Sequence, residues 1–200
     1  MDKWQNIPGE TPINDISGLI LRNVTTRSQL NDLEAENIRK AVVIYLAAKP
    51  TKRQAPFTLN WIYKLHQQMF GYVWAWAGTK RTVELNFGVP VHQIDVLLQN
   101  MLDTLEYRRR SDAIDMLEES ARLHHQAVYI HPFLNGNGRW ARLLANIWLA
   151  RNDSPITFWP DQAVGNKSII RDEYLEAIRA ADAGNFALLI ELHRRYSTKI

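Results

Sequence analysis

A twelve-residue segment that begins at His131, HPFLNGNGRWAR, contains a base, a glycine-rich turn and two arginines. His131 can accept a proton near neutral pH, and a well-placed general base contributes roughly 10²–10⁴-fold in rate. Gly136 and Gly138 allow positive φ angles and a close approach of the backbone to a ligand. Arg139 and Arg142 follow three residues apart, and guanidinium groups bind phosphate oxygens in a bidentate fashion. The spacing predicts a site that handles phosphate groups.

The residues after this turn are expected to form a helix, because large apolar side chains recur there every three or four positions: Trp140, Leu143, Leu144, Ile147 and Trp148. A helix N-terminus has unpaired N–H groups and about half a positive charge. Phosphate oxygens are therefore expected on the backbone N–H groups of Asn137, Gly138 and Arg139. The apolar stripe would face the core and the arginines would face the site.

Each of these features also has an ordinary structural explanation. A single histidine is often structural, an Asn-Gly run often forms only a turn, and arginines at a helix start are often solvated. Their combination in this order favours a functional site. A base beside a bound polyphosphate indicates activation of an attacking hydroxyl group.

The order of these residues resembles the signature of the Fic (Fido) family, His-x-Phe-x-(Asp/Glu)-Gly-Asn-Gly-Arg-x-x-Arg. The matching positions are His131, Phe133, Gly136, Asn137, Gly138, Arg139 and Arg142. The resemblance implies an all-α Fic-type helical bundle with one β-hairpin flap. It also implies a protein adenylyltransferase, which transfers AMP from ATP to a Ser, Thr or Tyr hydroxyl of a target protein. In this interpretation His131 is the general base, the Asn135–Gly138 turn and Arg139 hold the ATP phosphates, and Arg142 binds the distal phosphates.

One position departs from the signature. Asn135 stands where the family usually has a carboxylate that holds Mg²⁺, and a neutral carbonyl oxygen attracts a hard cation less strongly. Mg²⁺ remains the expected cofactor, with Asn135 as its doubtful ligand. Two alternatives stay open: a Fic-fold enzyme that transfers another nucleotide or a phosphate, and a catalytically idle nucleotide-binding or interaction module.

The composition indicates a globular protein. The chain has 200 residues, 46% hydrophobic content, no cysteine and a net charge of +3, so nucleic acid is not an expected partner. Its start lacks a signal-peptide pattern, and no stretch approaches 18 apolar residues, which favours a cytoplasmic protein without membrane contact. Residues 1–24 are predicted to form an N-terminal arm and residues 25–200 the Fic domain.

Two short stretches near the start of the chain narrow the resemblance. GETP from position 9 and TTRSQLN from position 25 resemble the bacterial Fic subgroup called mobile mystery protein B, which is linked to mobile elements. This implies a toxin-like component of such a system, with a possible antitoxin partner.

Apolar periodicity predicts six further helices and one strand-like segment. The helices are expected at residues 28–49, 58–70, 93–109, 114–129, 169–183 and 186–196. The strand signal lies in residues 80–91, which alternate and then turn, and is interpreted as the hairpin. By the resemblance, the hairpin docks the target segment through β-augmentation, with Lys80, Arg81, Thr82 and Val83 as docking residues. An ordinary surface hairpin is the alternative.

Glu34 is predicted to face the apolar stripe of the first helix, and a carboxylate in that place needs a partner or water. Fic proteins often carry an inhibitory helix whose glutamate pairs with the second arginine of the motif. Glu34 is therefore the candidate self-inhibitory residue, expected to pair with Arg142, and Glu36 is the alternative. A frayed helix end that lets Glu34 reach water is equally open.

Tyr174 lies in a Tyr-x-x-Ala-Ile stretch. In Fic proteins a helix of this kind borders the adenine pocket, so the resemblance makes Tyr174 a candidate nucleobase contact. A plain core position explains the same pattern.

Overall fold

The computed structural model describes residues 16–21, 23–110, 115–160 and 169–197, and these residues form seven α-helices and one 3₁₀ turn. The predicted arm, residues 1–24, lies mostly outside them. The elements are α1 (Arg27–Leu46), α2 (Leu59–Phe70), η1 (Val91–Gln93), α3 (Ile94–Arg108), α4 (Met116–Ile130), α5 (Asn137–Arg151), α6 (Ile169–Asp182) and α7 (Ala187–Arg195). The predicted all-α bundle is confirmed, with the helix ends within three residues of the predictions.

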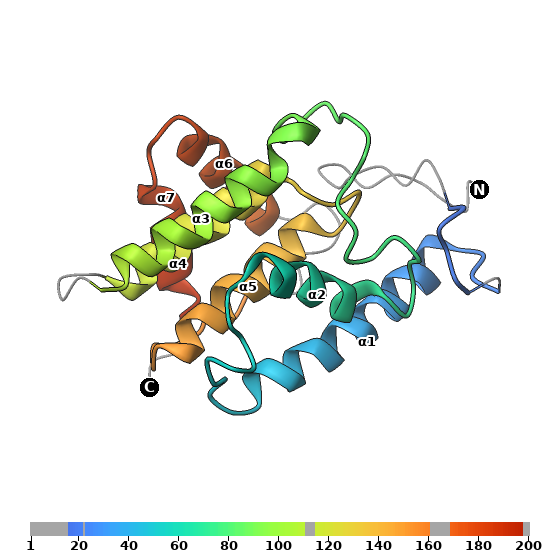
Figure 1. Cartoon of the computed structure of the whole chain (residues 1–200), viewed down its shortest axis with the longest axis horizontal. Coiled ribbons are helices and arrows are strands. Elements are labelled where there is room, and N and C mark those ends of the chain that lie inside the picture. The colour runs from blue at the N-terminus through green and yellow to red at the C-terminus, as the bar shows by residue number, and fades with distance from the viewer. Residues whose placement is uncertain (1–15, 22, 111–114, 161–168, 198–200) are drawn as a thin grey trace.

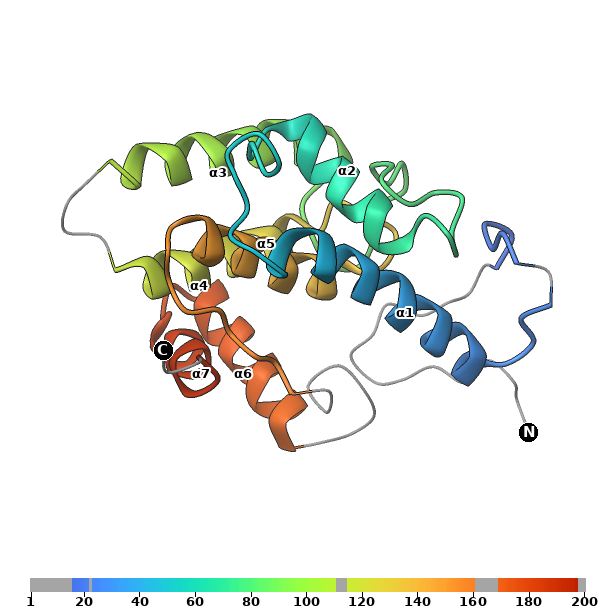
Figure 2. The ribbon, with the colours of Figure 1, turned by 90° about the horizontal axis from the view of Figure 1, so that it is seen from below.

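Helix α5 lies at the centre of the bundle. Figures 1 and 2 show α1 and α2 on one side of it, α3 and α4 along another, and α6 with α7 beyond α4. Its predicted apolar stripe is buried, and Trp140, Leu144, Ile147 and Trp148 have no exposed surface. Burial of such large side chains stabilises the fold by roughly 1.5–3 kcal/mol each. The turn that precedes α5 is thus attached to a helix that is buried along most of its length.

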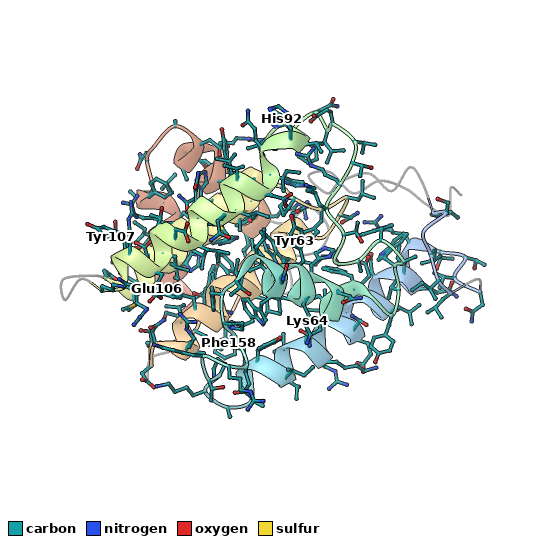
Figure 3. The ribbon with its side chains drawn as sticks, in the orientation of Figure 1. Tyr63, Lys64, His92, Glu106, Tyr107 and Phe158 are labelled. Carbon is teal, nitrogen blue, oxygen red and sulfur yellow. The ribbon has the colours of Figure 1, made fainter. Side chains whose placement is uncertain are left out.

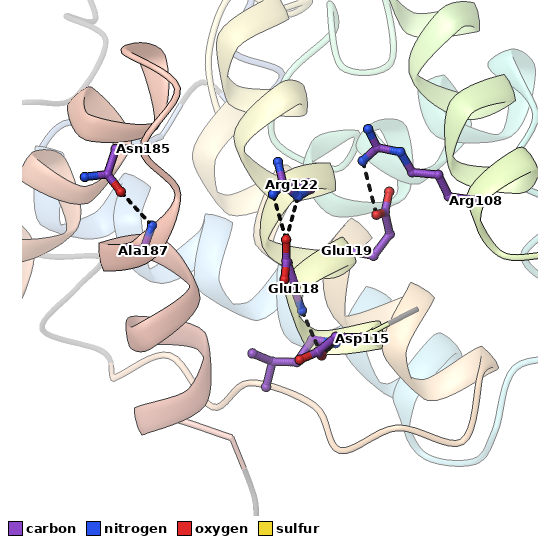
Figure 4. Close-up of polar contacts among 8 residues, drawn as sticks. Arg108, Asp115, Glu118, Glu119, Arg122, Asn185 and Ala187 are labelled. Atoms are coloured by element: carbon purple, nitrogen blue, oxygen red, sulfur yellow. Dashed lines mark hydrogen bonds and ion pairs between the residues drawn. The ribbon is translucent and has the colours of Figure 1, made fainter. Parts of the chain in front are cut away.

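Local capping explains where several helices begin. Thr26 and Gln29 form a capping box at the start of α1, and Thr58 accepts the N–H of Trp61 at the start of α2. At the start of α4, Asp115 accepts the N–H groups of Leu117 and Glu118. Figure 4 shows this cap.

Two side-chain pairs link α3 to its neighbours, one near each end of the helix. Arg108 pairs with Glu119 of α4, as Figure 4 shows. The Tyr63 hydroxyl of α2 donates to Asp95 of α3 at 2.6 Å. Figure 3 places Tyr63 on the α2 ribbon and His92 at the end of α3 opposite to Glu106 and Tyr107.

The predicted hairpin in residues 80–91 does not form. Residues 80–90 are irregular, and the β-pairing found in the described part of the chain consists of two isolated bridges, Leu19 with Trp74 and Thr157 with Ser197. The reason is that the buried guanidinium of Arg81 binds the carbonyl groups of Val83 and Val89. A side chain satisfies the carbonyls that a strand ladder would otherwise pair.

None of the described helices combines the length and the apolar character that crossing a membrane requires.

Candidate active site

His131 lies at the end of α4 in the left-handed backbone region, with φ 53° and ψ 59°. Its Nδ1 atom lies 3.3 Å from the carbonyl oxygen of Val128, which can only accept, so Nδ1 carries the proton. Nε2 then has a free lone pair, and it is buried without a hydrogen-bond partner among the described residues. Burial lowers the pKa of His131 to about 4, and the positive charge of Arg81 acts in the same direction. The imidazole is therefore neutral at pH 7 and able to accept a proton at Nε2.

The turn after His131 is held by side chains that bind its backbone. The amide of Asn137 accepts the N–H of Phe133 and donates to its carbonyl oxygen, both at 2.9 Å. His66 accepts the N–H of Gly78 at Nδ1, so its Nε2 carries the proton and donates to the carbonyl oxygen of Asn135 at 3.0 Å. Burial lowers the pKa of His66 to about 3, which keeps this ring neutral. The turn is preorganised by two buried polar side chains.

The two glycines of the turn have different roles. Gly136 has φ 79°, and a Cβ there would lie 2.6 Å from the Phe70 ring, so this position requires glycine. Gly138 lies in the first turn of α5, and of the two glycines only Gly136 adopts a positive φ. The nearest atom to a Cβ at Gly138 would be the Tyr174 hydroxyl at 3.8 Å. Gly138 thus leaves the first turn of α5 accessible. Gly136, the N-cap residue, has no side chain that could cap the N-terminus of α5.

Arg139 forms the ion pair that was predicted for Arg142. Its guanidinium lies 2.5 Å from Glu34, whose other carboxylate oxygen accepts the indole N–H of Trp74 at 2.6 Å. Glu34 is only 2% exposed, so the frayed-end alternative is wrong. The pairing differs because α1 packs across α2 and α5 and presents Glu34 near Phe70, over whose ring Arg139 lies at 4.8 Å. Glu36, the other candidate, is exposed and pairs with Arg39.

Arg142 lies on the side of α5 that faces α6. It is 8% exposed, its guanidinium lies 5.4 Å from the Tyr174 ring and 6.0 Å from the Trp159 ring, and no carboxylate of the described residues forms an ion pair with it. Burial lowers the pKa of Arg142, and the charges of Arg139 and Arg171 add to this effect. A buried cation without a carboxylate is costly, and an anionic ligand would relieve that cost.

Tyr174 is part of the smaller hydrophobic core, as the core alternative predicted, and its hydroxyl also belongs to a buried polar chain. Its hydroxyl lies 3.1 Å from Nε2 of His124, whose Nδ1 lies 3.0 Å from Nε2 of His193. His193 in turn contacts the hydroxyl of Thr157 at 3.0 Å. This chain joins α4, α6 and α7 behind the first turn of α5, and it fixes the Tyr174 hydroxyl beside Gly138.

The four predicted docking residues divide into two pairs. Lys80 forms an ion pair with Asp95, and Arg81 is 1% exposed with its donors on backbone carbonyls, so the guanidinium of Arg81 does not face a phosphate or a target. Thr82 and Val83 are exposed. Only the second pair presents side chains to a docking partner.

Asn135 offers little to a resident metal ion. Its Oδ1 atom accepts the N–H of Gly136 at 2.6 Å, and the described residues contain no group of three or more His, Cys, Asp or Glu side chains suited to a metal. A neutral oxygen that already accepts a hydrogen bond does not fit a resident Mg²⁺ site.

Two contributors to the site were not predicted as such. His66 is fully buried and holds the turn through its hydrogen bond to the carbonyl of Asn135. Trp74 donates a hydrogen bond to Glu34, and this contact had no signal in the sequence. Helical spacing identifies the buried face of a helix and gives no indication of the partner of a polar atom on that face.

Comparison with known proteins identifies the class to which this site belongs. Residues 56–149 match the model of the Fic/DOC family, and this stretch includes α2, α3, α4 and the whole segment from His131 to Arg142. Over these residues, which make up just under half of its length, the chain is similar to the Fic/DOC family.

Curated relatives carry the name protein adenylyltransferase. The chain is 26% identical over 152 residues to protein adenylyltransferase fic-1 of Caenorhabditis briggsae, which covers 74% of this chain and 28% of the relative. It is 32% identical over 135 residues to protein adenylyltransferase Fic of Drosophila willistoni, which covers 64% and 25%. The chain therefore spans about a quarter of the length of these relatives.

Solved structures share the fold. Fic-1 from C. elegans aligns with a TM-score of 0.69 and 23% identity over 90% of this chain and 52% of that one. BepC from Bartonella tribocorum, solved with bound AMPPNP, aligns with a TM-score of 0.67 and 17% identity over 88% and 90%.

Proposed function

We propose that this protein is a protein adenylyltransferase, which transfers AMP from ATP to a Ser, Thr or Tyr hydroxyl of a target protein. The observation that supports this most directly is the state of His131, a neutral imidazole with a free Nε2. It precedes a helix N-terminus whose first turn is open at Gly138. The curated names of the relatives and the AMPPNP in the BepC structure support ATP as the nucleotide.

In the proposed reaction, the target hydroxyl oxygen attacks the α-phosphorus of ATP and its proton passes to Nε2 of His131. A new oxygen–phosphorus bond forms, the bond from the α-phosphorus to the pyrophosphate oxygen breaks, and pyrophosphate leaves with that electron pair. The N–H groups of the Asn137–Arg139 turn and the Arg142 guanidinium stabilise the phosphate charge. A Mg²⁺ ion bound to ATP would neutralise phosphate charge, and Asn135 would add little to its binding because it supplies no charge.

The target protein would dock on the irregular loop of residues 80–90, at its exposed positions Thr82 and Val83. Tyr174 would contribute to the wall of the nucleotide site through its hydroxyl beside Gly138. Glu34 would restrain the enzyme by keeping Arg139 away from ATP. The bacterial mobile-element subgroup and a separate antitoxin partner rest on the sequence resemblance, and the cytoplasmic location rests on the lack of a long apolar stretch in the sequence.

The experiment described below also distinguishes two other functions. ATP bound in the reverse direction would present a different phosphorus to the hydroxyl and give transfer of a phosphate. The neutral Asn135 favours an idle nucleotide-binding module.

The test is label transfer from α-³²P-ATP and from γ-³²P-ATP, in parallel, to a bacterial lysate. We compare wild type, His131→Ala and His125→Ala. His125 lies on the same helix α4 but pairs with Asp182 of α6, so it controls for the loss of a helix-bound histidine. We expect label from the α position only, lost in His131→Ala and retained per folded molecule in His125→Ala. Label from γ alone would indicate phosphate transfer, and ATP binding without label would indicate an idle module.

A further inference from the structure

Arg81 is the most deeply buried cation of the described residues, and its side chain reaches three backbone carbonyl groups. Nε donates to His131 at 2.8 Å, one terminal nitrogen donates to Val83 at 2.9 Å, and the other donates to Val89. Its nearest carboxylate, Glu84, lies 3.5 Å away and is largely exposed. The positive charge is therefore balanced mainly by carbonyl dipoles. The rigid fork of a guanidinium group can bind several carbonyls in this way better than a lysine amine can.

Residues of the loop donate hydrogen bonds to three consecutive backbone carbonyl groups, those of the proposed base and of the residues before and after it. The carbonyl of Ile130 accepts the N–H of Val89 at 3.4 Å, and that of Pro132 accepts the N–H of Arg81 at 2.9 Å. The carbonyl between them, that of His131, accepts from the Arg81 side chain. His131 has a left-handed backbone, which costs roughly 1–3 kcal/mol in a residue other than glycine and persists only where the surroundings hold it. The loop and the base thus form one hydrogen-bonded unit.

The tip of the same loop rests directly on the imidazole. The ring of Phe87 meets the ring of His131 edge-on at 4.6 Å. At Gly88, where φ is 85°, a Cβ would lie 2.7 Å from Cβ of His131 and 3.1 Å from the Arg81 guanidinium. Phe87 and Gly88 of the loop therefore cover the His131 side chain, while Arg81 binds the His131 backbone.

We propose that Arg81 is a positioning residue, which fixes both the direction of the His131 imidazole and the loop on which the target docks, so that docking and proton transfer share one geometry. This inference rests on the proposed function. The guanidinium donors of Arg81 bind the carbonyl groups of His131, Val83 and Val89. Its action passes through the backbone of His131 and through the exposed positions Thr82 and Val83 that follow it.

The alternative is that Arg81 only stabilises the fold, and Arg151 provides the matched control. Arg151 is also partly buried, donates to a backbone carbonyl (Ala55, 2.9 Å) and packs over aromatic rings, but it lies at the other end of α5. Both arginines are changed to Gln, and Arg81→Lys is added. Thermal unfolding gives the folded fraction of each variant, and kcat and KM are referred to that fraction.

We expect Arg81→Gln to lower kcat for the target at least tenfold with little change in KM for ATP, and Arg151→Gln to leave both per folded molecule unchanged. Arg81→Lys should resemble Arg81→Gln, because one amine cannot reach three carbonyls. The acidic limb of the pH–rate profile should move from near pH 4 toward pH 6.5, because a loosened loop hydrates His131 and removal of the Arg81 charge also favours the imidazolium. A simple loss of folded enzyme would scale the rate equally at every pH.

A second readout does not depend on catalysis. The ¹⁵N chemical shifts of the His131 ring report which nitrogen carries the proton and how the ring titrates. We expect wild type and Arg151→Gln to keep the Nδ1–H form down to low pH, and Arg81→Gln to show mixed tautomers and a higher pKa. Unchanged His131 spectra in Arg81→Gln would overturn the inference. Absence of AMP transfer in wild type, with the expected spectra, would instead refute the proposed function and leave the positioning role intact.

Discussion

The two ends of helix α5 are completed in opposite ways. At the C-terminal end, Arg151 donates to the carbonyl of Ala55, and Asn152 donates its side-chain N–H to the carbonyl of Trp148 at 2.8 Å. At the N-terminal end, Gly136 supplies no side-chain cap and Nε2 of His131 has no partner among the described residues. The chain satisfies the polar groups at one end of its central helix and leaves them available at the other, which is the expected pattern when a ligand completes the site.

The same contrast holds for the arginines on this helix. Arg151 is held by its own carbonyl partner and by the rings of Phe57 and Trp148. Arg139 is occupied by Glu34, whereas Arg142 is buried and forms no ion pair with a described carboxylate. The three therefore represent a structural cation, a restrained cation and an available cation.

The largest expected effect comes from exchanging the available cation for a neutral side chain. Arg142→Gln should weaken ATP binding roughly 10- to 100-fold, because a hydrogen bond to a charged group contributes about 1.5–3 kcal/mol. Arg151→Gln should lower the midpoint of thermal unfolding and leave ATP affinity unchanged. Calorimetric ATP titration and thermal unfolding of both variants measure the two effects. Equal loss of ATP affinity in the two variants would show that the ends of α5 do not differ in function.

The next effect concerns the restrained cation. Glu34→Gly should release Arg139 for the phosphates and raise AMP transfer roughly tenfold, which corresponds to about one charge-assisted hydrogen bond. Glu36→Gly is the control, because it places the same helix-weakening residue on α1 but removes only exposed pairs, those with Arg39 and Lys40. The measurement is the initial rate of label transfer at saturating ATP, compared between the two variants and wild type. If both variants gain equally, α1 acts through its general stability and not through the Glu34–Arg139 pair.

The contrast along α5 also explains what could be predicted from the sequence. Periodic apolar residues identify α5 and its buried stripe, because burial repeats with the helical period. The motif from His131 to Arg142 identifies the site, because local spacing determines the turn. The partner of Glu34 could not be predicted, since Arg139 and Arg142 are separated by less than one turn and the choice depends on how α1 crosses α5.

The false hairpin has a related cause. Residues 80–91 alternate as a strand does, but alternation does not reveal that Arg81 is buried and binds the carbonyls of its own loop. The contacts of His66 could not be predicted either, since both of its ring nitrogens bind backbone groups distant in sequence. Polar side chains that bind remote backbone groups leave no periodic signal, and both examples lie around the open end of α5.

The smallest effect is expected at the turn that opens α5. Asn135→Asp adds a charge at the place where Oδ1 already accepts the N–H of Gly136, and an aspartate can keep that bond. The added charge should lower the Mg²⁺ concentration required for half-maximal transfer roughly two- to fivefold, as a partly solvated charge interaction contributes up to about 1 kcal/mol. Asn137→Asp is the control, because it adds the same charge two residues later but loses the amide bond to the carbonyl of Phe133 and should mainly lower stability. Mg²⁺ titrations of AMP transfer and of ATP binding separate the two variants. An unchanged Mg²⁺ requirement in Asn135→Asp would mean that the metal is held by ATP and water alone, and that the open end of α5 acts through its N–H groups and Arg142.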